Sequence, residues 1–161
     1  IHHKKYQVVT CATAFPTTVA PIVQNGFLPV FVDVDPHTLN PRLEDVLDEL
    51  RRPHVAGIIQ AHTLGFPYDA DTIRKECDAR GLWFIEDSCD ALGAEIGDNR
   101  VGSFGNVSTL SMFPAHHITS MEGGAVFTSS AELYRLVETL RSWGRHCFLS
   151  GTKVKLSENR I

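Results

Sequence analysis

The feature that most constrains the fold of this 161-residue chain is an alternation of short β-branched runs with amphipathic stretches. In one such stretch Leu43, Val46, Leu47 and Leu50 recur at helical spacing. Strands are expected at Leu28–Asp35, His54–His62, Leu82–Ser88, Asn106–Phe113 and Gly124–Ser129, and helices at Arg42–Arg52, Asp69–Gly81 and Ser130–Gly144. Strands that alternate with helices in this way predict an α/β domain with a mostly parallel sheet.

Several boundaries of these elements carry their own signals. Gly81 is expected to end one helix, and Ser130 is a candidate N-cap of the last helix. Asp33 and Asp35 end the first expected strand, where an acid most often caps the helix that follows.

Charge and hydropathy exclude two classes of partner. The formal net charge is -4, so the chain lacks the basic surface expected of a nucleic-acid-binding protein. Its apolar runs are all shorter than the ~20 residues that a membrane-spanning helix needs. The opening residues "IHHKKYQVVT" do not resemble a signal peptide, because the apolar core after the charged residues is too short. We therefore expect a cytoplasmic protein with reduced cysteines and no membrane association.

The expected strands carry reactive side chains at their carboxyl ends, where open α/β sheets bind ligands. Asp87 follows the apolar run "LWFI", and a carboxylate there is costly unless it meets a cation. Pyridoxal phosphate (PLP) would supply that cation at its ring nitrogen. Phe15 could then stack on the ring and Ser111 could bind the phosphate. Taken singly, each assignment is weak, because a residue such as Phe15 is more often part of the core and Ser111 on an alternating strand could face solvent.

Three motifs carry a resemblance to a known family. They read "FPTTVAPIVQNGFLPVFVDVD", "EDSCDALGAEIGDNRVGSFGNVSTLSMFPAHH" and "EGGAVFT". The chain, from about residue 8 to 147, resembles the DegT-type sugar aminotransferases and dehydratases. These are PLP enzymes of fold type I, so the resemblance implies a three-layer αβα large domain.

The resemblance also implies the site residues. In the family's aminotransferases, a lysine five residues after the phosphate-binding serine forms a Schiff base with PLP. Here Ser111 is followed at that distance by His116, which cannot form one but can move protons near neutral pH. The resemblance implies that Phe15, Asp87, Asp90, Ser111 and His116 bind the cofactor and that His116 is catalytic. His117 is expected to be a hydrogen-bonded structural neighbour.

With a histidine at this position, the chain resembles one branch of the family, the 3-dehydrases and 3-dehydratases represented by CDP-4-keto-6-deoxyglucose 3-dehydrase. This resemblance implies dehydration at C3 of a CDP- or GDP-linked 4-keto-6-deoxyhexose with pyridoxamine phosphate (PMP), in deoxysugar and lipopolysaccharide (O-antigen) synthesis. A homodimer, and for some members a reductase partner, is implied as well. An aminotransferase that has lost its lysine, and a non-catalytic protein that binds PLP or a sugar nucleotide, are the alternatives.

The cysteines raise a separate question. Cys89 and Cys147 are separated by 57 residues, which matches the first two of four iron-sulfur ligands in the CDP-sugar dehydrases. Leu149 and Ser157 stand at the other two positions, so no metal site and no stable [2Fe-2S] cluster is expected. Three explanations compete. The lineage could have lost the cluster, the tail could be a truncation or sequencing artefact, or the two cysteines could be small buried hydrophobes.

Domain organisation follows from the same patterns. Residues 1–149 are expected to form the central part of the PLP-binding large domain. Residues 150–161 are polar and aperiodic, and we expect an irregular tail that is cut before the small C-terminal domain.

Overall fold

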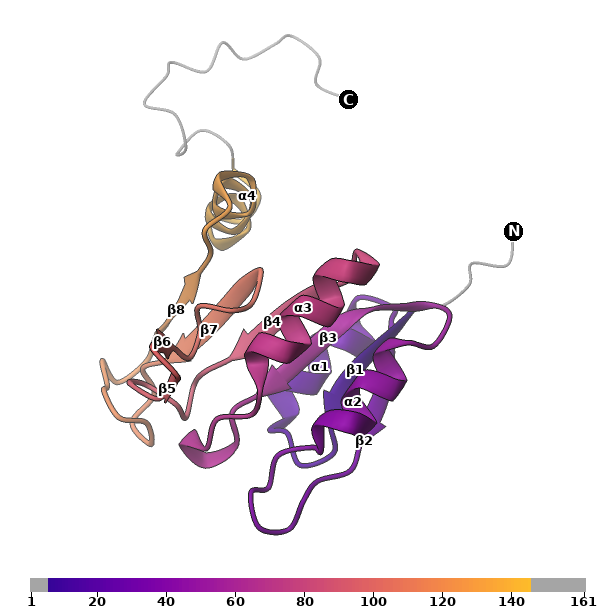
Figure 1. Ribbon diagram of the computed structural model, residues 1–161. Coiled ribbons are helices and arrows are strands. Elements are labelled where there is room, and N and C mark those ends of the chain that lie inside the picture. The colour runs from indigo at the N-terminus through magenta and orange to yellow at the C-terminus, as the bar shows by residue number, and fades with distance from the viewer. Residues whose placement is uncertain (1–5, 146–161) are drawn as a thin grey trace, which may run out of the picture.

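The computed structural model describes residues 6–145 (Figure 1). Cys147 and the expected tail at 150–161 therefore lie outside the described residues. The helices are α1 (Pro16–Gln24), α2 (Leu43–Leu50), the 3-10 turn η1 (Thr63–Gly65), α3 (Ala70–Arg80) and α4 (Ala131–Arg141). The strands are β1 (Gln7–Cys11), β2 (Leu28–Val32), β3 (Val55–Ala61), β4 (Trp83–Asp87), β5 (Glu95–Ile96), β6 (Asn99–Arg100), β7 (Val107–Ser111) and β8 (Gly124–Phe127).

The main sheet has the order β2-β1-β3-β4-β7-β8. Every neighbouring pair is parallel except β7 and β8, which are antiparallel. The mostly parallel α/β sheet predicted from the sequence is therefore confirmed. Parallel pairing brings the carboxyl ends of β1, β3, β4 and β7 to one edge, which is where ligands bind in such sheets.

Helices cover both faces of the sheet (Figure 1). On one face Val8 and Ile59 pack with Ile22 of α1, which is 1% exposed. On the other, Val9 and Ile58 pack with residues of α2 and α3. Successive strand residues thus point to opposite layers, as the period of a strand requires. The three-layer αβα arrangement is confirmed.

The signals predicted at Gly81 and Ser130 are confirmed, and Asp69 is a further cap. Asp69 accepts a hydrogen bond from Thr72 N at 3.0 Å, and Gly81 ends α3 in the left-handed conformation with φ 67°. Ser130 accepts one from Leu133 N at 3.2 Å and so begins α4. These caps pair backbone groups that a helix leaves without partners at its ends.

The expected capping role of Asp33 and Asp35 was wrong. Asp33 Oδ1 accepts a hydrogen bond from Val34 N, and Asp35 Oδ1 accepts one from His37 N. Helix α2 begins only at Leu43, so both acids order a local turn instead.

Helix α1 was not expected from the sequence. Pro16 opens it at the first helical position, which tolerates proline because the N–H there has no helical partner. Pro21 inside it and two threonines weaken the helical signal. Among the described residues, no helix is both long and apolar enough to cross a bilayer.

Candidate active site

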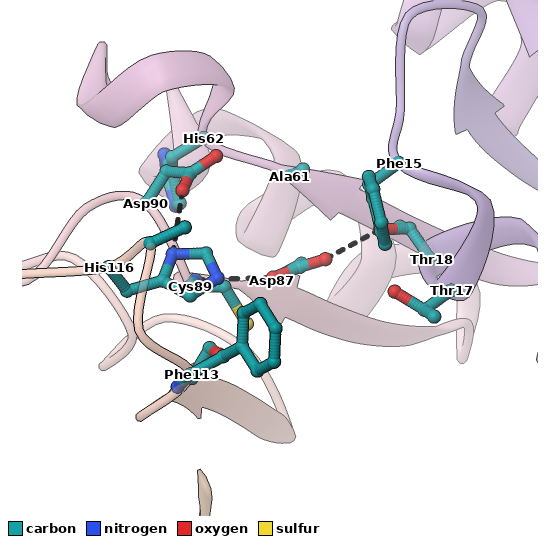
Figure 2. Close-up of a pocket in the computed structure, with 12 residues that line it drawn as sticks. Phe15, Thr17, Thr18, Ala61, His62, Asp87, Cys89, Asp90, Phe113 and His116 are labelled. Carbon is teal, nitrogen blue, oxygen red and sulfur yellow. Dashed lines mark hydrogen bonds and ion pairs between the residues drawn. The ribbon is translucent and has the colours of Figure 1, made fainter. Parts of the chain in front are cut away.

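A cavity of about 550 Å³ lies at the carboxyl ends of the strands (Figure 2). This size falls within the roughly 300–1,000 Å³ of small-molecule sites. Its lining includes all five residues proposed from the sequence to bind a cofactor, namely Phe15, Asp87, Asp90, Ser111 and His116. Figure 2 shows the Asp87 carboxylate between Phe15 and Thr18 on one side and Phe113 and His116 on the other.

Asp87 is the last residue of β4, and its carboxylate faces the α1 side of the sheet. Thr18 Oγ1 donates a hydrogen bond to Asp87 Oδ2 at 2.6 Å. The Cys89 backbone N–H and the Thr109 hydroxyl donate to Oδ1 at 3.2 and 3.4 Å. No lysine, arginine or histidine of residues 6–145 pairs with it. Neutral donors thus fix an anion that has no counter-ion of its own on this part of the chain.

The preceding residue, Glu86, points to the opposite face and is fully buried. Its carboxylate accepts hydrogen bonds from the backbone N–H groups of Gly102, Phe104 and Gly105, at 2.9, 2.7 and 2.6 Å. His62 Nε2 lies 3.2 Å from Glu86 Oε1. Burial alone would raise the pKa of Glu86, but the hydrogen bonds from His62, Gly105 and Gly102 outweigh it and lower this pKa. Glu86 therefore ties β4 to the loop that follows it.

His116 follows β7 in a turn closed by its backbone N–H, which donates to Phe113 O at 3.0 Å. Its Nδ1 lies 2.9 Å from Asp90 Oδ1. The ring N–H direction misses that oxygen, so the contact is an ion-pair distance without hydrogen-bond alignment, and Nδ1 has no other partner among the described residues. The imidazole is 21% exposed and the Asp90 carboxylate 48%.

Phe15 does not lie in the core and Ser111 does not face solvent fully, although the sequence allowed both positions. Phe15 is 71% exposed, so it is not a core residue. It precedes Pro16, and the residue before a proline is held in an extended conformation, which presents its ring at the cavity. Ser111 is half-buried, and its Oγ accepts a hydrogen bond from Phe113 N at 3.2 Å. Its hydroxyl proton remains available to a ligand.

Cys89 also lines the cavity. Burial and the neighbouring Asp87 raise the pKa of its thiol to about 12. The thiol is therefore protonated at neutral pH and is a poor metal ligand in this state. Its proposed spacing partner, Cys147, lies outside the described residues.

Thr18, Phe113 and the pairing of His62 with Glu86 carry no signal that marked them in the sequence. Thr18 lies on the unexpected helix α1, so no local pattern connected it with Asp87. His62 ends the expected strand His54–His62 and Glu86 lies in the expected strand Leu82–Ser88, but their pairing depends on the register Gln60↔Glu86 between β3 and β4. His117 is exposed and makes no side-chain hydrogen bond within residues 6–145, so the expected structural bonding of His117 is not found.

A mostly parallel sheet between helical layers, with an aspartate at the carboxyl end of a central strand, occurs in several classes of α/β protein, so comparison with known proteins decides the class. The family model described as "DegT/DnrJ/EryC1/StrS aminotransferase family" matches residues 2–158. The chain belongs to this family.

Curated relatives include both dehydratases and aminotransferases. The lipopolysaccharide biosynthesis protein RfbH of Salmonella typhimurium is 48% identical over 145 residues, covering 88% of this chain and 32% of the relative. A dTDP-4-dehydro-2,6-dideoxy-D-glucose 3-dehydratase of Saccharopolyspora spinosa is 47% identical over 88% of this chain and 30% of its own length. GDP-perosamine synthase of Vibrio cholerae is 36% identical over 77% of this chain and 34% of its own length. The chain therefore spans about a third of the length of these relatives.

Solved structures agree on the fold. E. coli GDP-4-keto-6-deoxy-D-mannose-3-dehydratase with bound hydrated PLP superposes with a TM-score of 0.85 at 33% identity, over 91% of this chain and 38% of that one. An aminotransferase from Psychrobacter cryohalolentis has a TM-score of 0.85 at 28% identity, over 97% of this chain and 40% of that one. The family fold is thus shared by dehydratases and aminotransferases, and the side chains of the site have to distinguish them.

Proposed function

We propose that the protein catalyses the PMP-dependent 3-dehydration of a nucleotide-linked 4-keto-6-deoxyhexose in deoxysugar and lipopolysaccharide synthesis. The observation that carries this proposal is the imidazole of His116, which lines the same cavity as Asp87. It stands where the family resemblance places the lysine of the aminotransferases. A base without a primary amine can move protons but cannot capture PLP covalently.

The cavity suits a pyridoxal-type cofactor. Asp87 is an anion held by three neutral donors, so it can accept a protonated pyridine nitrogen without losing an existing ion pair. Ser111 can donate its hydroxyl proton to a phosphate oxygen, and Phe15 can cover an aromatic ring. When bound, PMP supplies an amine for the sugar ketone and a ring that accepts electrons.

The roles of the protein groups follow from their chemistry. Asp87 stabilises positive charge on the ring nitrogen. His116 takes up a proton at a nitrogen of its own imidazole and returns it, which assists loss of the C3 hydroxyl of the sugar as water. Phe15 and Phe113 are both exposed at the cavity, at 71% and 48%, and can exclude water from a bound ligand.

Two other functions are compatible with this cavity. A sugar-nucleotide aminotransferase is supported by relatives such as GDP-perosamine synthase, but an aminotransferase normally exchanges its cofactor through a lysine. A non-catalytic protein that binds PLP or a sugar nucleotide would share the cavity without turnover. A nucleotide sugar as substrate, a homodimer and a reductase partner are parts of the proposal.

The test is an assay of C3 deoxygenation. The full-length protein is incubated with an excess of PMP and with one sugar at a time, a CDP-, GDP- or dTDP-linked 4-keto-6-deoxyhexose, and the products are analysed by NMR and mass spectrometry. PMP is in excess because replacing the C3 hydroxyl by hydrogen takes two electrons, which its amine would supply on conversion to PLP and ammonia. We expect a 3-deoxy product from one of them, and a rate about 10²–10⁴-fold lower for His116→Asn. Transfer of an amino group to the sugar would identify an aminotransferase. Binding without turnover of any substrate would favour the non-catalytic alternative.

A further inference from the structure

We propose that Asp90 is a positioning residue for His116 rather than a ligand of the cofactor. Its carboxylate holds the proton on Nδ1 of His116 and leaves Nε2 as the nitrogen that exchanges protons in the cavity. For its catalytic consequence this inference rests on the proposed function. Its structural content, the tautomer of one histidine, can be tested without any substrate.

The first support is the state of His116 Nδ1. This atom is buried from solvent and makes no hydrogen bond with residues 6–145, and a buried polar atom without a partner is costly. Within the described residues, Asp90 Oδ1 is the carboxylate oxygen that pairs with it, at 2.9 Å. The separation of 2.9 Å is that of a hydrogen bond, so the pair lacks only the alignment of N–H with oxygen. In Figure 2 the ring of His116 lies with Asp90 on one side and Asp87 on the other.

The second support is the rigidity of the turn that carries Asp90. The turn is closed by Ala91 N, which donates to Ser88 O at 3.1 Å, and Ala91 is 3% exposed. Gly65 of η1 packs directly against it, because a Cβ on Gly65 would lie 2.7 Å from the Asp90 carbonyl oxygen. The Asp90 backbone is therefore fixed between η1 and the end of β4, as positioning requires.

The chemical consequence is a defined tautomer. A neutral imidazole carries its proton on one nitrogen, and the hydrogen bond at that nitrogen decides which one. An aspartate at Nδ1 selects the form in which Nε2 is unprotonated and basic. Loss of the aspartate leaves both tautomers populated, so a fraction of the molecules presents the wrong nitrogen.

The experiment measures the tautomer directly. The full-length protein is labelled with ¹⁵N-histidine, the His116 signals are assigned by their loss in His116→Asn, and the ¹⁵N shifts of Nδ1 and Nε2 are compared in wild type, Asp90→Ala, Asp90→Asn and Asp90→Glu. Asp98→Ala is the control, since Asp98 is an exposed carboxylate in the turn between β5 and β6. PMP affinity is measured by fluorescence for each variant, and circular dichroism verifies folding.

We expect wild type and Asp98→Ala to show protonated Nδ1, Asp90→Ala and Asp90→Asn to show mixed tautomers, and Asp90→Glu to restore the wild-type form in part. PMP affinity should stay near wild type in all of them. The kcat for dehydration should fall about 10- to 100-fold in Asp90→Ala with little change in KM. An unchanged tautomer in a folded Asp90→Ala overturns the inference, as does a loss of PMP affinity without a tautomer change. A changed tautomer in a protein that dehydrates no sugar would retain the inference and overturn the proposed function.

Discussion

The carboxylate of Asp87 lies among neutral donors, which is what its proposed role toward a cationic ring nitrogen requires. It receives hydrogen bonds from Thr18, Thr109 and the Cys89 backbone, all of them neutral. Asp87→Asn keeps a similar shape but removes the negative charge. We expect it to lower dehydration by about 10²-fold or more, because charge on the ring nitrogen is no longer stabilised.

The measurement for Asp87→Asn is the rate at which bound PMP exchanges its C4′ proton with solvent deuterium. Circular dichroism verifies that the fold is kept, and Asp98→Asn is the matched control on an exposed carboxylate. Exchange at the wild-type rate in Asp87→Asn would show that Asp87 only orders Thr18 and the following turn.

His116→Lys tests whether residue 116 occupies the position of the lysine that binds PLP covalently in the family's aminotransferases. A lysine amine at 116 should capture PLP covalently, whereas the wild-type imidazole should bind it without a covalent bond. After borohydride reduction and proteolysis, mass spectrometry should find PLP on residue 116 in the variant and an unmodified His116 in wild type. Dehydration should fall in the variant. If the lysine is not modified while PLP still binds, residue 116 does not face the reactive carbon of the cofactor.

At the scale of elements, the buried end of β4 makes a testable contribution to stability. Glu86 connects β4 to the loop at Gly102–Gly105 and to His62 after β3. Glu86→Gln leaves several backbone donors with one carbonyl oxygen to share. We expect the free energy of unfolding to fall by about 3–5 kcal/mol at neutral pH.

The loss of unfolding free energy in Glu86→Gln should depend on pH in one direction. The pKa of Glu86 in the folded state lies below its ordinary value of 4.5, so its stabilisation is present above about pH 4.5 and is lost as the pH falls through the folded-state pKa. The difference between wild type and Glu86→Gln should therefore narrow in acid. Denaturant unfolding at several pH values measures it. A difference that stays constant down to acid pH would contradict an ionised Glu86.

Glu76→Gln is the control for this measurement. Arg80 lowers the pKa of Glu76 too, but this pair lies at the surface of α3, where solvent screens it. We expect a far smaller loss of stability. Similar losses of unfolding free energy in Glu86→Gln and Glu76→Gln would show that the burial of Glu86 does not add to its stabilising effect.

The elements show which parts of the structure the sequence could predict. Periodicity and caps located α2, α3 and α4, because Ser130, Asp69 and Gly81 act on their own neighbours in the chain. Helix α1 was not predicted because its stability comes from the packing of Ile22 on Val8 and Ile59 and not from the helix propensity of its residues. The strand ends indicated Asp87, Phe15 and Ser111, and the resemblance added Asp90 and His116. The Asp87–Thr18 and Glu86–His62 pairs depend on tertiary placement, so neither argument could indicate them.

At the scale of the whole molecule, the cysteines decide whether a metal cluster can form. A [2Fe-2S] cluster needs four thiolates at one place. Cys11 and Cys77 are buried, and burial raises the pKa of the Cys77 thiol to about 11. Cys77 lies in the core between α3 and the sheet, whereas Cys89 lies at the cavity. Within residues 6–145, no three His, Cys, Asp or Glu side chains gather as metal ligands.

We therefore predict that the 161-residue chain holds no stable [2Fe-2S] cluster. Leu149 offers no ligand at the third position of the dehydrase spacing and Ser157 a poor one at the fourth. Anaerobic reconstitution with iron and sulfide, followed by desalting, should leave neither cluster absorbance nor stoichiometric iron. Cys89→Ser should behave like wild type. A cluster that survives desalting in wild type and disappears in Cys89→Ser would contradict the prediction, and it would require that the thiol of Cys89, whose pKa is about 12 without metal, is deprotonated by iron.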